Sequence, residues 1–416
     1  MILNKKRKIM NHTRREFFSV MGLGALSLKN FLVRGQENSP SLTPLKLPKI
    51  SNVKITDVDV YYYDLPLLEP FKISIAEMKD ALNVLVRLHT NQGIVGWGEA
   101  SPFPALTGDT QATSIAAAKD IAELVKGQDA LNYVKIINAI HSFIPHNPCI
   151  KAAFDMALFD ILGKVADLPL YKLLGGAKNS FETDLTISLH TPEETAIRGL
   201  DAVKKGFRTI KAKVGVSMES DVARIKALRE AVGPKISIRI DANQAWSVPE
   251  AIKTLDRLTE YNIQLIEQPV SASDLDGLKR VRNSVKIPVM ADEALFSPAD
   301  ALKIIKSEAA DYLNIKLMKA GGILPSLKIA HLGEAAGLRC MVGCMNESNL
   351  SISAGAHLHA SQSNIIFADL DTSFFLKVDP VIGGIKINNG IVTLPEQSGI
   401  GAEVDPTWFK KLKKAF

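Results

Sequence analysis

Short apolar runs alternate with amphipathic stretches through the central half of the chain. The polar residues that end these runs recur roughly every 25 residues, and they are Lys213, Asp241, Glu267, Asp292 and Lys316. A strand, a helix and two loops occupy about that length in a repeating βα unit. The rhythm therefore predicts an α/β fold built on a TIM-type barrel of eight parallel strands, with these residues on the second to sixth strands.

A different pattern flanks the barrel, whose first and last strands we expect at residues 184–188 and 365–368. Before the barrel, strict alternation predicts strands, and a helical period predicts helices. The expected strands are 53–63, 82–88 and 94–99, and the expected helices are 110–125, 132–140 and 151–165. After residue 374, short alternating runs with glycine turns contain no further βα unit, so this segment is expected to fold back onto the first domain.

The amino-terminal residues carry the features of a twin-arginine export signal. A basic stretch precedes the pair Arg14 and Arg15, two phenylalanines follow, and an apolar run that contains glycine continues to Leu28. We therefore expect residues 1–49 to be an export signal and linker, which would place the protein in the periplasm. The alternative is a disordered basic arm, and without a functional leader the protein would be cytoplasmic.

Composition and charge exclude several classes of protein. Of the 416 residues, 46% are hydrophobic and 23% are charged, which is typical of a globular protein, and no interior run reaches membrane-spanning length. The net charge of +6 comes largely from basic clusters near the two ends, at 5–8 and 410–414, so we expect no nucleic-acid partner. Three cysteines build no disulfide framework.

Lysines mark the chemistry that the barrel would carry. Lys211 and Lys213 are two residues apart on a strand, so both point to the same side, here the barrel interior, where charge is costly unless the site uses it. Lys316 lies half a turn of the barrel away. Ammonium groups on opposite sides could remove a proton from one face of a carbon and return it to the other. The alternative for the pair is a solvated edge strand.

Asp241, Glu267 and Asp292 lie between the two lysine strands and supply only oxygen donors. This donor set favours Mg²⁺, with Mn²⁺ as the alternative, over Zn²⁺. We expect the ion to stabilise negative charge formed when the proton leaves, and Asn243 and Glu293 to orient its ligands. A lysine base also needs a pKa lowered from about 10.4 to about 7 or 8, which a neighbouring ammonium and a dication would favour.

The motifs KAKVG, RIDANQAW, IEQPV, MADEALF and LNIKLMKAGG, with the Asp369-Leu370-Asp371 stretch, jointly resemble the enolase superfamily. The resemblance runs from about residue 53 to the carboxyl terminus, and it is strongest to the dipeptide epimerases of the muconate-lactonizing subgroup. It implies a modified (β/α)7β barrel at 177–373, an α+β capping domain at 50–176 and a carboxyl-terminal segment at 374–416 that completes the cap. It also implies an Mg²⁺-dependent isomerase in which Lys213 and Lys316 are the paired acid and base.

The same resemblance implies how a dipeptide would bind. Asp369 and Asp371 would bind its free α-ammonium, and Lys211 would contact its carboxylate. The remaining contacts to the ends of the dipeptide would come from Thr186, Cys344 and Asn346. A bound α-ammonium distinguishes dipeptides from muconate and succinylbenzoate, which carry no amine.

One departure from the family pattern concerns the substrate. Relatives that act on Ala-Glu carry an arginine in the loop after the PFK motif, and here that position is Ala76. Lys72 and Lys79 are poorer substitutes, and Glu69 and Glu77 in the same region would repel an acidic side chain. We therefore expect a small or apolar dipeptide such as Ala-Ala, derived from peptidoglycan or from scavenged peptides.

Alternatives remain open at this stage. A muconate cycloisomerase or an o-succinylbenzoate synthase would use the same lysines. A catalytically inactive peptide-binding protein would bind dipeptides without exchanging the α-proton. Related proteins often assemble as homo-oligomers, which is the expectation here by analogy alone.

Overall fold

The computed structural model describes residues 52–416, and the chain beyond residue 51 forms one compact unit. The predicted export signal and most of the linker lie outside the described residues. None of the helices described after residue 51 is long and apolar enough to cross a membrane. The predicted boundaries at 176/177 and 373/374 stay a prediction, because the contacts unite both sides of each boundary in the same unit.

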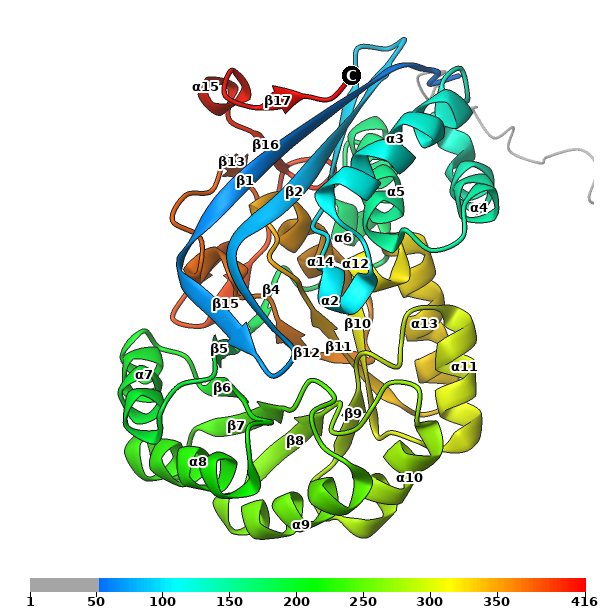
Figure 1. Ribbon diagram of the computed structural model, residues 1–416. Helices are drawn as coiled ribbons and strands as arrows, with labels where there is room; N and C mark the ends of the chain where they lie inside the picture. The colour runs from blue at the N-terminus through cyan, green and yellow to red at the C-terminus, as the bar shows by residue number, and fades with distance from the viewer. Residues whose placement is uncertain (1–51) are drawn as a thin grey trace, which may run out of the picture. The chain divides into compact units, whose positions relative to one another are not determined.

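The larger part of this unit is a barrel of eight parallel strands in sequential order, which confirms the predicted fold (Figure 1). The strands are β5 (Leu185–Ile187), β6 (Thr209–Lys213), β7 (Ser237–Asp241), β8 (Ile263–Glu267), β9 (Val289–Ala291), β10 (Tyr312–Lys316), β11 (Arg339–Gly343) and β12 (Ile365–Asp369). The helices between them are α7 (Pro192–Lys204), α8 (Met218–Val232), α9 (Val248–Leu258), α10 (Leu275–Ser284), α11 (Pro298–Ser307), α12 (Leu317–Ala320), α13 (Ile323–Ala335) and α14 (Asn349–Ser361). A helix follows each of the first seven strands, and the last strand has none, which is the (β/α)7β pattern.

The cap combines an antiparallel sheet with helices (Figure 1). Its sheet contains β1 (Ile55–Ile73), β2 (Ala76–Thr90), β3 (Val95–Ala100) and β17 (Lys413–Lys414). Its helices are α2 (Pro104–Thr107), α3 (Gln111–Val125), α4 (Tyr133–Phe143), α5 (Pro148–Ala166) and α6 (Leu170–Leu173). Because β17 pairs with β1, the carboxyl-terminal segment returns to the sheet in which the cap begins.

Short elements complete the chain. They are β4 (Ser180–Glu182), β13 (Val381–Gly383), β14 (Lys386–Asn388), β15 (Ile391–Thr393), β16 (Ala402–Val404), α15 (Pro406–Phe409) and the 3₁₀ turns at Ala130–Asn132, Thr259–Tyr261 and Thr372–Phe374. β15 pairs with β4, directly before the first barrel strand. The carboxyl-terminal segment thus contacts both the cap and the start of the barrel.

The first two strands are much longer than predicted. Ile73 pairs with Ala76, so β1 and β2 form a continuous hairpin whose tip is a two-residue turn at Ser74 and Ile75. The sequence placed this region in a loop because Pro66 and Pro70 interrupt the alternation. The structure accommodates both prolines with a register shift between Pro66 and Phe71, as expected for residues that cannot donate a backbone hydrogen bond. In Figure 1 the tip reaches the mouth of the barrel.

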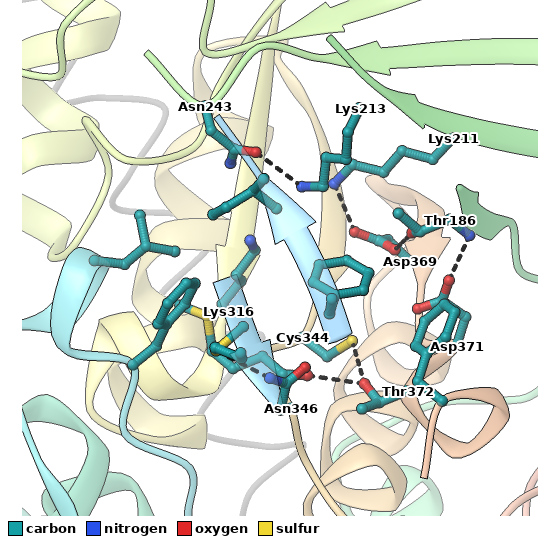
Figure 2. Close-up of a pocket in the computed structure, with 17 residues that line it drawn as sticks. Thr186, Lys211, Lys213, Asn243, Lys316, Cys344, Asn346, Asp369, Asp371 and Thr372 are labelled. Atoms are coloured by element: carbon teal, nitrogen blue, oxygen red, sulfur yellow. Dashed lines mark hydrogen bonds and ion pairs between the residues drawn. The ribbon is translucent and has the colours of Figure 1, made fainter. Parts of the chain in front are cut away.

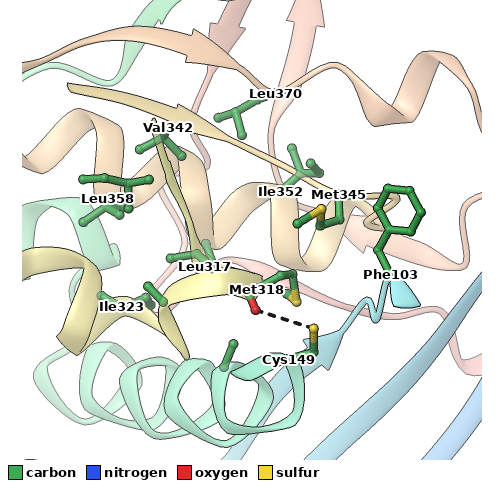
Figure 3. Packing of buried hydrophobic residues seen from close by; sticks show 14 of the residues in the cluster. Phe103, Cys149, Leu317, Met318, Ile323, Val342, Met345, Ile352, Leu358 and Leu370 are labelled. Atoms are coloured by element: carbon green, nitrogen blue, oxygen red, sulfur yellow. Dashed lines mark hydrogen bonds between the residues drawn. The ribbon is translucent and has the colours of Figure 1, made fainter. Parts of the chain in front are cut away.

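Helix α5 fixes the cap on the barrel. It is buried on nearly every side, between the cap sheet and the barrel helices (Figure 1). On the sheet side, a Cβ added at Gly98 would lie 1.8 Å from the Ala153 carbonyl oxygen, so only glycine permits this approach. On the barrel side, Asp155 accepts hydrogen bonds from the first backbone amides of α13, and Figure 3 shows the Cys149 thiol donating to the Met318 carbonyl.

Candidate active site

The residues predicted from spacing meet at the carboxyl ends of the barrel strands. Lys213, Asp241, Glu267 and Lys316 are the last residues of β6, β7, β8 and β10, and Asp292 directly follows β9. Register pairs Lys213 with Asp241 and Asp241 with Glu267, so neighbouring strands place these side chains side by side. β6 and β10 are four strands apart in a sheet of eight, which places the two lysines on opposite sides of the barrel mouth.

Asp241, Glu267 and Asp292 form a compact carboxylate cluster. Their oxygens lie within 4.8 Å of one another, and all three side chains are buried. Asn243 donates its backbone N–H to Asp241 Oδ1 at 2.9 Å, and Asn314 donates to Glu267 Oε1 at 2.7 Å. Lys211 Nζ lies 3.1 Å from Asp241 and 2.7 Å from Glu267, so lysine ammoniums balance part of this buried negative charge. The cluster offers oxygen donors alone, which fits Mg²⁺ or Mn²⁺.

The predicted orienting residues contact this cluster and the lysine beside it. Asn243 accepts a hydrogen bond from Lys213 Nζ at 3.1 Å and donates to Glu293 Oε1 at 3.0 Å. Lys213 Nζ also lies 2.6 Å from Asp241 Oδ2. Figure 2 shows Asn243 directed at Lys213 at one end of the pocket.

Charges in the cluster determine the protonation of its neighbours. Burial alone would lower the pKa of Lys316, but Asp292, at 2.8 Å, and Glu267 outweigh it, and the pKa is raised. Burial likewise opposes the charge on Lys211, yet Asp369 and Glu267 hold its pKa well above the usual range. The expected lowering of a lysine pKa, which depended on a bound dication, stays a prediction, because the carboxylates here act on Lys316 without one. A cation bound to those carboxylates would reduce the effect that raises it.

The Asp-Leu-Asp stretch forms a second acidic group beside the first. Thr186 donates its backbone N–H to Asp371 Oδ2 at 2.6 Å, and Lys211 Nζ lies 2.8 Å from Asp369 Oδ2. Burial and the charge of Asp369 raise the pKa of Asp371 to about 7. Burial would also raise the pKa of Asp369, but Lys211 lowers it to about 2. One permanently charged and one titrating carboxylate therefore face the pocket from β12 and the turn after it (Figure 2).

Cys344 and Asn346 line the same pocket from the loop after β11, as expected. The thiol of Cys344 lies 3.0 Å from the hydroxyl of Thr372, and burial raises its pKa well above the usual range, so it stays a neutral wall residue. The cap positions this loop, because the Asn346 carbonyl accepts hydrogen bonds from Asn83 at 3.1 Å and from Ser101 at 2.8 Å.

The cap covers the pocket with apolar side chains. This roof consists of Phe71, Ile73, Met78, Phe103, Leu106 and Phe375. In the antiparallel hairpin, directly paired residues share a face, so Phe71 with Met78 and Ile73 with Ala76 lie on the pocket side. No basic residue belongs to the roof among the described residues that line this pocket.

The charged residues of the hairpin point away from the pocket. Lys72 is opposite Glu77 on the other face, where their charged groups lie 3.5 Å apart in solvent, and Lys79 is exposed. Glu69 forms a two-bonded ion pair with Arg198, at 2.6 Å for each bond. Neither lysine is therefore placed where it could replace the missing arginine, whereas repulsion of an acidic substrate by these glutamates stays a prediction. Strand alternation turns Lys72, Glu77 and Lys79 outward, and the register shift between Pro66 and Phe71 accompanies the outward position of Glu69.

Besides Asn314, two polar residues that support the cluster were not predicted from the sequence. Lys319 is buried in α12, bonded to the side chain of Asp292 and, at 3.1 Å, to the Asn314 carbonyl. Gln268, directly after Glu267, accepts the backbone N–H groups of Asp292 at 3.0 Å and Ala294 at 3.1 Å. A lysine inside the apolar run LMKA was the one available signal, and nothing in its spacing assigns it a partner.

Comparison with known proteins agrees with this architecture. Residues 55–175 match the mandelate racemase / muconate lactonizing enzyme N-terminal domain, and residues 195–408 match the enolase C-terminal domain-like family. The chain belongs to the mandelate racemase and muconate lactonizing group of the enolase superfamily, which confirms the resemblance inferred from the motifs.

Several similar proteins are dipeptide epimerases, and an N-succinyl-L-Arg/Lys racemase of Bacillus cereus is also similar, at 38% identity over 363 residues that cover 86% of this chain and 98% of the relative. The chain is 42% identical over 351 residues to the hydrophobic dipeptide epimerase of Enterococcus faecalis, covering 84% of this chain and 99% of the relative. It is 41% identical over 352 residues to the L-Ala-D/L-Glu epimerase of Clostridium acetobutylicum, with coverages of 84% and 98%. A crystal structure of a dipeptide epimerase from Cytophaga hutchinsonii, complexed with Mg and D-Ala-L-Val, has a TM-score of 0.85 at 41% identity and covers 87% of this chain and 99% of its own.

Proposed function

We propose that this protein is a metal-dependent isomerase that epimerises dipeptides at an α-carbon. Relatives of this activity align over nearly their whole length with this chain. Asp241, Glu267 and Asp292 would hold Mg²⁺, the ion present in the related dipeptide complex, with Mn²⁺ as the alternative. The bound ion would supply Lewis-acid stabilisation of negative charge on the substrate oxygen.

Lys213 and Lys316 act in this proposal as the acid and base on the two faces of the α-carbon. Their positions on opposite sides of the mouth suit removal of the proton by one and delivery by the other. Lys211 stays charged between Glu267 and Asp369 and contacts the substrate carboxylate. Asp369 and Asp371 bind the α-ammonium, and Thr186, Cys344 and Asn346 enclose the dipeptide ends.

The substrate is a dipeptide with small or apolar side chains. The single observation that carries this choice is the apolar roof, because Phe71, Ile73 and Met78 face the pocket where an acidic side chain would need a cation. A carboxylate buried against these residues would lose its hydration without gaining a partner.

A direct test is a screen of L,L, L,D and D,D dipeptides in D₂O with the full chain and Mg²⁺, read by mass shift. Exchange of the α-proton with epimerisation, lost on addition of EDTA and restored by Mg²⁺, is the expected result. Tight binding of a dipeptide without exchange would show the inactive binding protein instead. Turnover of muconate, or formation of o-succinylbenzoate from its hydrated precursor, with no dipeptide exchange would favour a cycloisomerase or an o-succinylbenzoate synthase, respectively.

Location and assembly belong to the same proposal. Periplasmic placement through the twin-arginine-like leader would give the enzyme access to peptidoglycan fragments or scavenged peptides. Fractionation of cells that express the full chain, compared with an Arg14→Lys, Arg15→Lys variant, tests it. Assembly into a homo-oligomer stays a prediction by analogy.

A further inference from the structure

A serine at the tip of the β1–β2 hairpin reaches the loop after β7. Ser74 Oγ lies 2.9 Å from the carbonyl oxygen of Ala242 and 3.2 Å from that of Asn243. A hydroxyl has one proton to donate, so the two carbonyls share it, with Ala242 as the nearer acceptor. Both carbonyls belong to the segment that directly follows the metal-site residue Asp241. The tip of the hairpin is therefore in direct contact with the loop that follows β7.

The segment that Ser74 contacts has an unusual backbone. Asn243 and Gln244 have φ angles of 43° and 69°, in the left-handed region that costs a residue other than glycine about 1 kcal/mol or more. Such a conformation persists only when its surroundings hold it. Here the Asn243 N–H donates to Asp241 Oδ1 at 2.9 Å and the Gln244 N–H donates to the Gln268 carbonyl at 2.8 Å. Among the described residues, Ser74 provides the only hydrogen bonds from a cap side chain to the carbonyls of Ala242 and Asn243.

The side chain of Asn243 connects this segment to Lys213. Its oxygen accepts from Lys213 Nζ at 3.1 Å, and its nitrogen donates to Glu293 Oε1 at 3.0 Å. The two partners need opposite ends of the amide, so the orientation of the amide is fixed (Figure 2). Lys316 forms no hydrogen bond or ion pair with Ser74, Ala242 or Asn243, and its ammonium lies 2.8 Å from Asp292.

The hairpin tip fits closely between the loops after β6 and β7. Gly215 has a φ of 104°, and a Cβ added there would lie 2.5 Å from Ala245 Cβ and 3.2 Å from Ser74 Cβ. A side chain at position 215 would therefore clash chiefly with Ala245 and would also crowd Ser74, so glycine suits this close packing of the two loops and the tip. The KAKVG motif thus contains both Lys213 and the glycine that lies beside the tip.

We infer that Ser74 is a positioning residue that couples seating of the hairpin to placement of Lys213 through Asn243. The inference rests on the proposed epimerase function. With the tip seated, Ser74 holds the strained segment and Asn243 holds the ammonium of Lys213. With the tip withdrawn, proton transfer on the Lys213 face slows, whereas transfer on the Lys316 face keeps its geometry.

Ser188 offers a matched control, because it forms hydrogen bonds with the same hairpin at Lys72 rather than at the tip. The Lys72 N–H donates to Ser188 Oγ at 2.7 Å, and the Ser188 hydroxyl lies 2.6 Å from the Lys72 carbonyl oxygen. Ser188→Ala loosens the hairpin without touching Ala242 or Asn243. If hairpin mobility alone slows proton exchange, both Ser74→Ala and Ser188→Ala should show it. If the effect acts through Asn243, only Ser74→Ala should show it.

The kinetic test measures α-proton exchange in D₂O in two backgrounds at saturating dipeptide and Mg²⁺. Lys316→Ala leaves Lys213 as the base, and Lys213→Ala leaves Lys316. Adding Ser74→Ala should slow exchange about tenfold in the first background and less than about twofold in the second. Ser74→Thr keeps the hydroxyl and should retain the exchange rate of the Lys316→Ala background. Ser188→Ala should change the exchange rate equally in the two backgrounds. Equal slowing by Ser74→Ala in both backgrounds, or no slowing, would overturn the inference.

A second measurement separates this inference from the proposed function. Hydrogen–deuterium exchange of the full chain without substrate should show greater uptake at 242–246 in Ser74→Ala, but an increase confined to the hairpin in Ser188→Ala. If the unsubstituted chain exchanges no dipeptide proton, the proposed function is wrong. Deuterium uptake at 242–246 would still show whether Ser74 stabilises this segment. Unchanged uptake at 242–246 in Ser74→Ala would contradict the coupling.

Discussion

The floor of the pocket consists of strand ends, and its roof consists largely of a hairpin and neighbouring loops. The floor gathers buried charges, with Lys213 and Lys316 6% and 4% exposed, and each is held by a carboxylate. The roof presents apolar side chains such as Phe71, Ile73 and Met78, and it keeps its charged residues on the outer face. Strand register fixes the directions needed for chemistry, whereas the hairpin side chains that line the pocket, unlike Ser74 at the tip, can vary without disturbing the barrel. We therefore assign the reaction to the floor and the choice of substrate to the roof.

The largest effect should come from removing either base of the floor. Lys213→Ala and Lys316→Ala should each lower epimerisation by about 10²- to 10⁴-fold, because each removes proton transfer on one face. Each variant should still exchange the proton of the one stereoisomer that its remaining lysine reaches. Chiral chromatography with mass detection in D₂O measures both rates. Two-way activity at full rate in either variant would refute the two-base mechanism.

Asp371 should give the next largest effect, with a defined pH dependence. Its pKa of about 7 means that it binds a proton as the pH falls below 7, and the proton must leave before an α-ammonium can pair with it. The apparent affinity for a dipeptide should therefore fall below about pH 7, by up to about tenfold per pH unit, and level off above it. Asp371→Asn should raise KM by roughly 10- to 100-fold at pH 8 and flatten this acid limb. An unchanged acid limb in the variant would exclude Asp371 as its cause.

A cation placed in the roof should change the substrate preference without changing the chemistry. Ala76 shares the pocket face of the hairpin with Ile73. Ala76→Arg should shift the ratio of kcat/KM for Ala-Glu over Ala-Leu by about tenfold toward Ala-Glu, since a carboxylate then gains a partner. Competition between the two dipeptides in one reaction measures the ratio. Ala76→Gln is the control of similar length without charge, and an equal shift in both variants would contradict the electrostatic explanation.

The smallest effect should follow from changing the outer charges of the hairpin. Glu69 pairs with Arg198 on the surface, and both side chains are more than one third exposed. Glu69→Gln should change the same substrate ratio by less than about twofold and stability by at most about 1 kcal/mol, because exposed ion pairs contribute little. A large gain in Ala-Glu turnover would show that the charge of Glu69 does act on the pocket.

The sequence predicted the floor better than the roof for a physical reason. Floor residues end strands of a regular βα repeat, so local spacing alone placed Lys213, Asp241 and Lys316 together. The roof depends on which face of β1 and β2 each residue occupies. Pro66 and Pro70 hid the strand in which that alternation applies, so Glu77 was placed near the substrate. Glu69 was placed there too, because the sequence does not reveal the register shift between Pro66 and Phe71.

Lys319 and Gln268 were missed for a different reason. Their contacts with Asp292 exist only once β8, β9 and α12 are assembled, and neither residue type has a spacing that predicts such a contact. The direction of the Lys316 pKa also depended on that assembly, because the carboxylates that raise it come from other strands. Spacing located the groups, and their mutual electrostatics required the three-dimensional arrangement.

The most direct test of the division between floor and roof is a competition experiment on the unsubstituted full chain. Equal concentrations of L-Ala-L-Leu and L-Ala-L-Glu are incubated with the protein and Mg²⁺ in D₂O, and deuterium at the α-carbon is followed by mass spectrometry. We predict that Ala-Leu exchanges at least about tenfold faster, since the roof offers apolar contact and no cation. Exchange of Ala-Glu at an equal or greater rate would contradict the assignment of substrate choice to the apolar roof.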